Sequence, residues 1–213
     1  GSDSGSTFAG TSADDTFSGQ IDDNTAANDT FNLTDTISGG AGTDTLSLTA
    51  LDYADNAALT VASVSGFEIL TLRAADGSAT TDDIIVTATN FPGLTTFNND
   101  RSTSNVQITA MAAGTSVNVL GNGSLTNADT TAAYDATVTT GTLNFKGGVT
   151  AGAVALNGTG LTTVAIGSSG ANNVVGAVTT NSAVVTAVTI AAEKALTVAS
   201  LGIGGTTAAS LTI

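Results

Sequence analysis

Hydrophobic residues alternate with threonine, serine or another short polar residue in many short runs of this 213-residue chain. Alternation with a period of two is typical of a β-strand that buries one face, and turn-forming glycine, asparagine, aspartate and serine separate the runs. The runs are TLSLTA (45–50), LTVASV (59–64), EILTLR (68–73), IIVTAT (84–89), NVQITA (105–110), SVNVL (116–120), ATVTT (136–140), TLNF (142–145), TTVAI (162–166) and ALTVA (195–199). The chain is therefore predicted to be all-β. Residues 51–60 and 189–199 are also compatible with a helical turn, although β-branched residues favour a strand in the second.

A longer recurrence runs through the second half of the chain. A bulky aliphatic residue followed by a small polar one recurs in steps of 18, 18, 17 and 18 residues, at Leu125, Leu143, Leu161, Val178 and Leu196. One coil of a parallel β-solenoid (β-helix) would place such residues in one inward row. The alternatives are a chance periodicity in a chain rich in threonine and valine, and a β-sandwich built from similar short strands.

The composition favours stacked thin layers. Hydrophobic residues make up 41% of the chain but aromatic residues only 4%, and there are 25 glycines and one proline. A core of alanine and valine without a large aromatic cluster is most easily built from many thin layers. We therefore expect a parallel β-solenoid, with the β-sandwich as the alternative.

The charge is acidic and uneven. Residues 1–100 contain 15 acidic residues and one basic residue, and residues 101–213 contain three of each, so the whole net charge of −14 lies in the first hundred residues. Nucleic-acid binding requires clustered lysine and arginine, so no nucleic-acid partner is expected, and the charge also argues against an anionic membrane surface. An acidic segment without bases repels itself unless cations bind to it.

The chain has no cysteine and no histidine. Disulfides, thiolate or imidazole metal sites and histidine-based catalytic triads are thereby excluded, and metals with oxygen ligands remain. The sequence has no apolar run of about 18 residues, so no membrane insertion is expected.

A short acidic motif occurs four times near the N-terminus. Each copy consists of an aspartate, a threonine and a hydrophobic residue, and the copies begin at Asp15, Asp29, Asp35 and Asp44. The segment GGAGTDTLS (39–47) fits the nonapeptide pattern GGxGxDxUx without a mismatch. The segments GTSADDTFS (10–18) and NTAANDTFN (24–32) are degenerate copies.

These residue types suit calcium. Ca²⁺ takes about six to eight oxygen ligands, aspartate supplies charge, and a tight glycine turn presents backbone carbonyls. The hydrophobic residue two places later begins a strand and fastens the turn to the core, while a neighbouring coil must complete the coordination. The expected metal-site residues, in order, are Asp44, Asp35, Asp15 and Asp29, the turn residues Gly39, Gly40 and Gly42, and then Asp14, Asp22 and Asp23.

Two other interpretations of the acids remain open. Aspartate is a common turn residue, so a solvated turn explains Asp22, Asp52, Asp55 or Asp76 at least as well as metal binding. Paired carboxylates also hydrolyse glycosides, but the sequence adds none of the aromatic platforms that sugar sites usually have. No catalytic residue is therefore predicted.

The segment GGAGTDTLSL (39–48) resembles the calcium-binding repeats of RTX proteins, which are exported by type I secretion. Together with DDTFSG (14–19), the stretch from Asn28 to Ala50 and VSGFEILTLRA (64–74), it is closer still to the calcium-dependent surface-layer (S-layer) proteins of Gram-negative bacteria such as Caulobacter. The resemblance covers residues 10–72. Beyond them it rests on composition.

The resemblance implies a secreted structural protein without catalysis, which tiles the bacterial cell surface as a self-assembled lattice. Calcium would fold the subunit and join subunits, and cell-surface polysaccharide would be bound by regions outside this chain. A single complete nonapeptide implies a few separate sites instead of a long ion ladder. The alternatives are an RTX-type adhesin or biofilm-matrix protein of the same fold, and a β-helical polysaccharide lyase that would use one of the four basic residues.

For the organisation of the chain, we expect an acidic RTX-like calcium-binding segment at residues 1–50. Neutral solenoid coils rich in threonine, alanine and valine follow at residues 51–213, within one continuous domain. Gly1 and Ser2 resemble a cloning remnant, and the last residues end within a strand-like pattern. The chain is therefore expected to be an internal segment of a longer protein.

Overall fold

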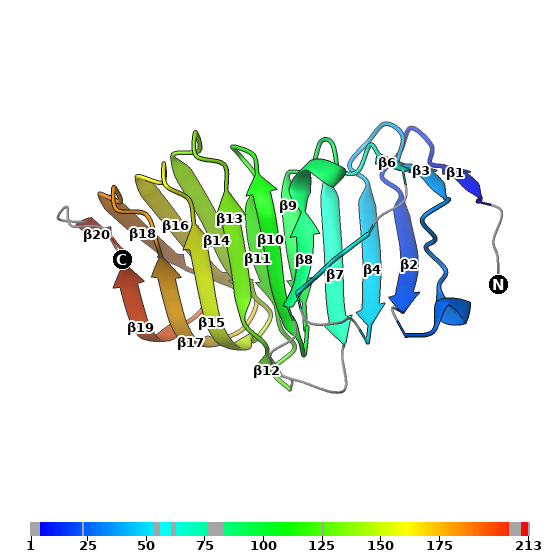
Figure 1. The fold of residues 1–213 in the computed structure, drawn as a ribbon. Coiled ribbons are helices and arrows are strands. Elements are labelled where there is room, and N and C mark those ends of the chain that lie inside the picture. The colour runs from blue at the N-terminus through cyan, green and yellow to red at the C-terminus, as the bar shows by residue number, and fades with distance from the viewer. Residues whose placement is uncertain are drawn as a thin grey trace.

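The structure, a computed structural model, describes residues 5–22, 24–52, 56–60, 63–75, 83–124, 126–204 and 210–212. The strands wind into an elongated β-solenoid, with the two chain ends at opposite ends of the molecule (Figure 1). Every strand pair in these residues is parallel. The all-β class and the parallel β-solenoid are thus confirmed. The β-sandwich alternative is wrong, because sandwiches of that class are built from antiparallel sheets.

The strands form three sheets that run along the solenoid. The long sheet contains β2 (Thr16–Asp22), β4 (Thr45–Leu51), β7 (Ile69–Ala75), β9 (Thr96–Asp100), β11 (Ser116–Leu120), β14 (Thr140–Lys146), β16 (Thr163–Ser169), β18 (Ala187–Ala192) and β20 (Ser210–Thr212). The second sheet contains β5 (Ala57–Ala58), β8 (Asp83–Thr87), β10 (Asn105–Met111), β12 (Thr126–Asn127), β13 (Thr130–Tyr134), β15 (Thr150–Asn157), β17 (Asn173–Thr180) and β19 (Leu196–Ile203). The short sheet contains β1 (Thr7–Ala9), β3 (Thr36–Ser38) and β6 (Ser63–Ser65).

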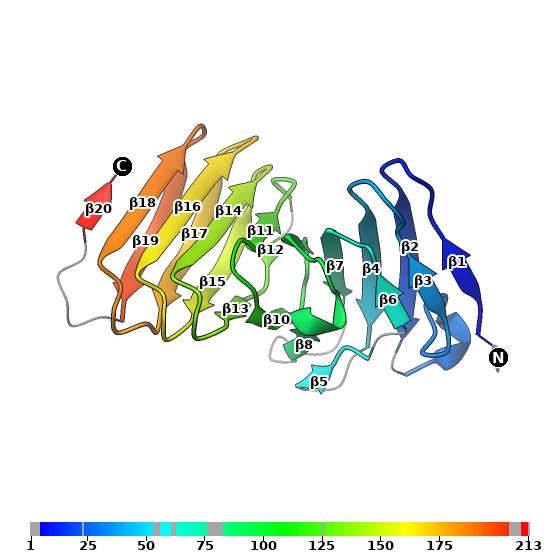
Figure 2. The same ribbon diagram turned by 90° about the horizontal axis from the view of Figure 1, so that it is seen from above.

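The short sheet covers only the first coils, as Figure 2 shows from above. After β8 the chain returns to the long sheet through the 3₁₀ turn η2 (Ala88–Asn90), and later coils alternate between the long and second sheets. A second 3₁₀ turn, η1 (Ala26–Asn28), lies between β2 and β3. The acidic N-terminal coils therefore have an extra corner at which turns can stack.

The core consists of rows of inward side chains stacked from coil to coil. Burial alternates along β4 and β7, as the alternating sequence predicts. One row runs through the long sheet as Phe17, Leu46, Leu70, Phe97, Val117, Leu143, Ile166 and Ile190. The hydrophobic residues of the four acidic motifs also face inward, with Phe31, Ile37 and Leu46 buried and Phe17 packed against the core.

The predicted coil length of 18 residues is wrong. Residues at equivalent positions of the long sheet are 20 to 29 residues apart, at Thr16, Thr45, Ile69, Thr96, Ser116, Thr142, Ala165, Thr189 and Thr212. Leu143 stacks on Ile166, whereas Leu161 lies in the turn before β16. In the second half most strands of both sheets are seven or eight residues long, and with the two turns they make coils longer than 18 residues, so the recurrence was the chance periodicity. Leu125 lies outside the described residues.

Most predicted strands are present, and the exceptions are local. Residues 136–139 of ATVTT form the turn before β14, where the N–H of Val138 donates to the carbonyl of Asp135 at 2.9 Å. Residues 189–199 contain parts of β18 and β19 and no helix. In 51–60, the described residues Ala57–Ala58 form β5, and residues 53–55 lie outside the described part, as do residues 61–62 of the predicted strand 59–64.

Tyr134 ties the second sheet to the long sheet through the interior. Its ring is buried, and its hydroxyl accepts a hydrogen bond from the N–H of Thr142 at 3.1 Å. The carbonyls of Thr115 and Thr142 lie 3.2 and 3.3 Å from the same hydroxyl, so either can accept its proton. Burial raises the pKa of Tyr134 to about 12, from an ordinary value of 10.0.

Replacing Tyr134 with phenylalanine should lower the free energy of unfolding by about 1–2 kcal/mol at pH 7, because buried backbone groups lose their partner. The raised pKa means that the neutral phenol favours the folded state, so its contribution is complete below about pH 10 and is lost as the pH rises to about 12. Denaturant unfolding from pH 7 to 12 should therefore show a smaller alkaline loss of stability in Tyr134→Phe than in the parent. Equal losses in the two proteins would contradict this role.

Candidate calcium-binding turns

Two glycine turns of successive coils stack on each other at the N-terminal end of the solenoid. They are residues 10–15 and 39–44, and each leads into a strand of the long sheet. The N–H of Ala41 donates to the carbonyl of Thr11 at 3.1 Å, and the N–H of Thr45 donates to the carbonyl of Asp15 at 2.9 Å. The third coil makes the same corner with the shorter turn 66–68, where the N–H of Gly39 reaches the carbonyl of Ser65 at 2.9 Å.

The glycines of the complete nonapeptide are required by this stacking. Gly40 and Gly42 have φ angles of +108° and +130°, which other residues rarely adopt. A Cβ atom on Gly39 would lie 2.7 Å from Oδ2 of Asp44 and would overlap the carbonyl oxygen of Gly66. The predicted turn is therefore confirmed as a close approach of backbone to backbone around one carboxylate.

The acids at the start of the long-sheet strands form a carboxylate ladder, defined here as Asp15, Asp44 and Glu68. Oδ1 of Asp44 accepts the N–H of Asp15 at 2.7 Å, and Oε2 of Glu68 accepts the N–H of Asp44 at 2.9 Å. Asp44 and Glu68 thus each cap the backbone of the preceding coil. Asp15, at the end of the ladder, accepts the N–H and hydroxyl of Thr11 at 2.6 and 2.9 Å.

Sequence reasoning missed Glu68. The signal was its position directly before the alternating residues of β7, which matches the positions of Asp15 and Asp44 before β2 and β4. The nonapeptide pattern did not reveal Glu68, because the pattern has five glycine-rich residues followed by an aspartate. The third coil has only the short turn 66–68, which ends in a glutamate.

Asp44 differs from the other two acids of the ladder in having a buried oxygen without a hydrogen-bond partner. Its side chain is fully buried, and Oδ2 accepts no hydrogen bond from the protein. A buried carboxylate oxygen is unfavourable unless it is paired with donors or a cation. Oδ2 lies beside Gly39, where a Cβ on that glycine would also meet the backbone carbonyl oxygen of Gly66 in the next coil. This donor set of carboxylate and carbonyl oxygens is the kind that calcium prefers.

Asp35 serves a different corner of the same coil. Its Oδ1 and Oδ2 accept the N–H groups of Ser6 and Asn32, both at 2.8 Å, and its side chain is buried. Asp35 precedes β3 of the short sheet, whereas Asp44 precedes β4 of the long sheet. The nine-residue step between them therefore moves from one corner to the next and does not pair them within one ladder.

The remaining predicted ligands cap backbone N–H groups of the N-terminal coils. Oδ1 of Asp29 accepts the N–H of Asp22 at 2.7 Å, and Oδ1 of Asp14 accepts the N–H of Thr43 at 2.8 Å. Asp22 caps the turn before η1, and the hydrogen bond from Asn28, at 2.7 Å, is the main cause that lowers the pKa of the Asp22 carboxyl. Asp22 thus has a turn role, but its side chain is buried and not solvated as that alternative supposed. Asp23 lies outside the described residues.

Within the described residues, no three acidic side chains gather closely enough to hold a metal ion by themselves. A calcium ion at the ladder would therefore be bound by Oδ2 of Asp44, at most one further carboxylate and backbone carbonyl oxygens. Such a site depends on two coils being stacked correctly, because neither turn alone supplies enough oxygens.

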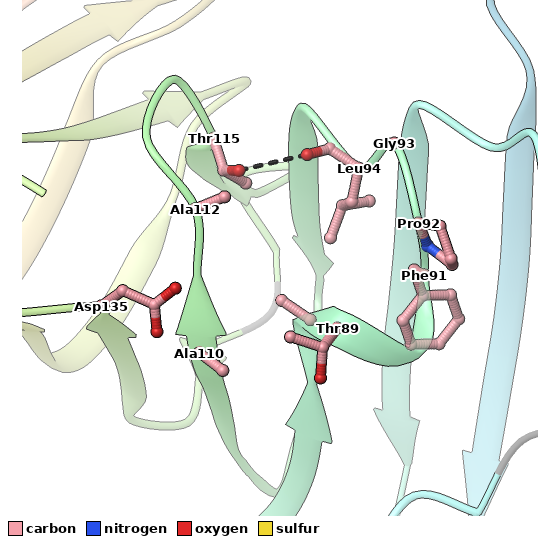
Figure 3. Close-up of a pocket in the computed structure, with 10 residues that line it drawn as sticks. Thr89, Phe91, Pro92, Gly93, Leu94, Ala110, Ala112, Thr115 and Asp135 are labelled. Atoms are coloured by element: carbon pink, nitrogen blue, oxygen red, sulfur yellow. Dashed lines mark hydrogen bonds between the residues drawn. The ribbon is translucent and has the colours of Figure 1, made fainter. Parts of the chain in front are cut away.

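The concave surfaces near η2 have different chemistry. A pocket of about 300 Å³ lies between η2 and the turn after β10, lined by Phe91, Pro92 and Leu94 with Asp135 at one side (Figure 3). The hydroxyl of Thr115 in its wall donates to the carbonyl of Leu94 at 3.1 Å. A second pocket of about 400 Å³ shares Pro92. One carboxylate in an apolar wall provides no acid and base pair.

No helix in the described part of the chain has the length and apolar character needed to cross a membrane. Comparisons with protein-family models, with curated proteins and with solved structures found no match to this chain.

Proposed function

We propose that this chain is a structural subunit of a calcium-dependent extracellular assembly, such as the S-layer of a bacterial cell surface. Calcium bound at the carboxylate ladder stabilises the N-terminal coils, and the folded solenoid associates with further copies of itself. The protein reaches the exterior by a type I secretion route, as RTX proteins do. Catalysis has no part in this function.

The observation that carries the proposal is the buried, unpartnered Oδ2 of Asp44, which lies beside Gly39 in the complete glycine turn. The carboxylate ladder also places three acids at equivalent positions of successive coils, in a segment where Arg73 is the one base among the first hundred residues. A divalent cation would both satisfy Oδ2 and reduce the repulsion along the ladder.

Calcium dependence gives the protein a means to fold after export. In the cytoplasm, where free calcium is low, the acidic segment repels itself and the N-terminal coils remain unstable. Outside the cell, calcium binds only the stacked turns, and a ligand bound only to the native state stabilises it by about 2.7 kcal/mol at a hundredfold excess over its Kd. Folding is thus coupled to the compartment in which the assembly is built.

Removing calcium with a chelator should lower the thermal midpoint followed by circular dichroism. The variant Asp44→Asn retains an oxygen that can accept the N–H of Asp15 but loses the charge. The calcium concentration needed to raise its thermal midpoint should therefore be at least about tenfold higher than for the parent. Asp129→Asn is the matched control, because Oδ1 of Asp129 also caps a backbone N–H, that of Ala153 at 2.7 Å, far from the ladder. An unchanged parent midpoint would contradict calcium binding. If the parent responds to calcium and the midpoint of Asp44→Asn rises at the same calcium concentration, the ion binds elsewhere.

Hydrogen exchange should locate the effect of calcium along the solenoid. A solenoid is held together coil by coil, so a ligand at one end stabilises mainly its own coils. Calcium should slow exchange in β2, β4 and β7 and leave β15 to β17 unchanged within the same molecule. Slowing that is uniform, or confined to the second half, would contradict the ladder as the site.

A second candidate function, an adhesin or biofilm-matrix protein, is favoured by the outer face of the long sheet. Two outward rows there carry short polar side chains in register from coil to coil. One row contains Thr16, Thr45, Thr96, Ser116 and Thr142, and the other contains Ser18, Ser47, Thr71, Asn98, Asn118 and Asn144. The hydroxyls and amides of these rows that are not buried, which excludes Asn118, could contact sugars or ice. Ile69 and Ala165 interrupt the first row and Gly167 ends the second, so we rank this function below self-assembly.

Light scattering separates the two candidates. Under the proposed function, adding calcium to the purified chain should raise scattering, and electron microscopy should show ordered arrays. An adhesin should stay monomeric with calcium and be retained by immobilised cell-surface glycans or by ice. If the chain is retained by glycans or ice and calcium does not raise its light scattering, the adhesin function is correct and self-assembly is not.

A further inference from the structure

Two asparagines interrupt the apolar rows inside the solenoid, where the first hundred residues meet the rest of the chain. Asn99 lies in an inward row of the long sheet between Leu72 and Val119. Asn127 lies in an inward row of the second sheet, paired with Ala151. Both side chains are fully buried. The residues that stack on Asn99 and Asn127 in the neighbouring coils are therefore apolar.

Each amide has one end bound to the protein and one end unbound. Nδ2 of Asn99 donates to Oγ1 of Thr130 at 2.8 Å, and Nδ2 of Asn127 donates to the carbonyl of Leu120 at 3.0 Å. Oδ1 of Asn99 and Oδ1 of Asn127 are buried and have no hydrogen-bond partner in the protein. A carbonyl can only accept, so the orientation of Asn127 is fixed with its oxygen pointing away from Leu120.

The turn after β9 links the surroundings of these two residues, and we call Asn99, Ser102, Asn127 and Thr130, which are all buried, the polar layer. Ser102, three residues after Asn99, accepts the N–H of Ala128 through its carbonyl at 2.9 Å, and Ala128 directly follows Asn127. Ser102 is itself buried, and its Oγ accepts the N–H of Ala74 at 2.9 Å. These hydrogen bonds join three coils, and the four side chains of the polar layer are hydroxyls and amides without charge.

We propose that this layer binds one internal water molecule, which donates its two hydrogens to Oδ1 of Asn99 and Oδ1 of Asn127. Buried polar atoms in proteins are nearly always satisfied, and internal waters typically bridge about three such groups. Water also suits either orientation of Asn99, because Oγ1 of Thr130 can donate or accept and water can do the same. A cation is disfavoured, because no carboxylate in this layer would balance its charge.

A double-mutant cycle tests the shared water. Asn99→Val and Asn127→Val match the apolar residues of neighbouring rows, so both variants should fold. If one water links the two amides, the effect of Asn127→Val on the unfolding equilibrium constant should differ by about fivefold or more between the parent and the Asn99→Val background. The control cycle pairs Asn127→Val with Asn98→Val, which lies on the outer face of the same strand, and its effects should agree within about twofold.

A high-resolution crystal structure provides the second measurement. The expected result is a density peak within hydrogen-bond distance of both amide oxygens, with a tetrahedral arrangement of neighbours. Additivity in the Asn99 and Asn127 cycle would overturn the shared site. So would a crystal structure in which the two oxygens have separate partners, face dry apolar space or surround a metal ion.

Discussion

Each coil of this protein has its backbone hydrogen bonds satisfied by the coils on either side, and this constraint determines much of the rest. Parallel pairing in register places equivalent residues of successive coils about 4.8 Å apart along the sheet. An apolar residue gains from this arrangement because it stacks on another, as Leu46 does on Leu70. A polar or charged residue is stacked on a similar residue at the same spacing. Each such row therefore needs hydrogen-bond partners for its polar groups or opposite charge for its charged groups.

The carboxylate ladder shows the difficulty most clearly. Two unit charges about 4.8 Å apart repel by roughly 3 to 4 kcal/mol at an effective dielectric constant of about 20. The chain reduces this repulsion by directing Asp44 at the N–H of Asp15 and Glu68 at the N–H of Asp44, so each charge faces a backbone dipole. This solution leaves Oδ2 of Asp44 without a donor. With almost no basic residues nearby in the sequence, a mobile cation is the remaining source of positive charge.

The sequence was sufficient to predict what depends on neighbours along the chain. Alternation identified most strands, and the nonapeptide identified the tight turn ending at Asp44. What it could not indicate was which strands stack, since this depends on turn lengths that vary from coil to coil. Leu143 and Leu161 therefore look equivalent in sequence although one lies in a strand and the other in a turn. Glu68 was missed because stacking, and not a shared motif, makes it equivalent to Asp44. Asn99 and Asn127 were missed because asparagine in a short polar run is typical of turns.

The acidic N-terminal coils and the middle coils stack their polar residues in different ways. On the outer face of the middle coils, from β9 to β14, Nδ2 of Asn118 donates to Oδ1 of Asn98 at 2.7 Å, and Nδ2 of Asn144 donates to Oδ1 of Asn118 at 2.9 Å. An amide both donates and accepts, so such a row extends from coil to coil without an external partner. A carboxylate only accepts, so a row of aspartates consumes backbone N–H groups and accumulates charge. This difference gives the acidic coils a use for cations that the amide-bearing coils do not have. The position of the charge along the chain is thus a reason to expect that only one end of the solenoid responds to calcium.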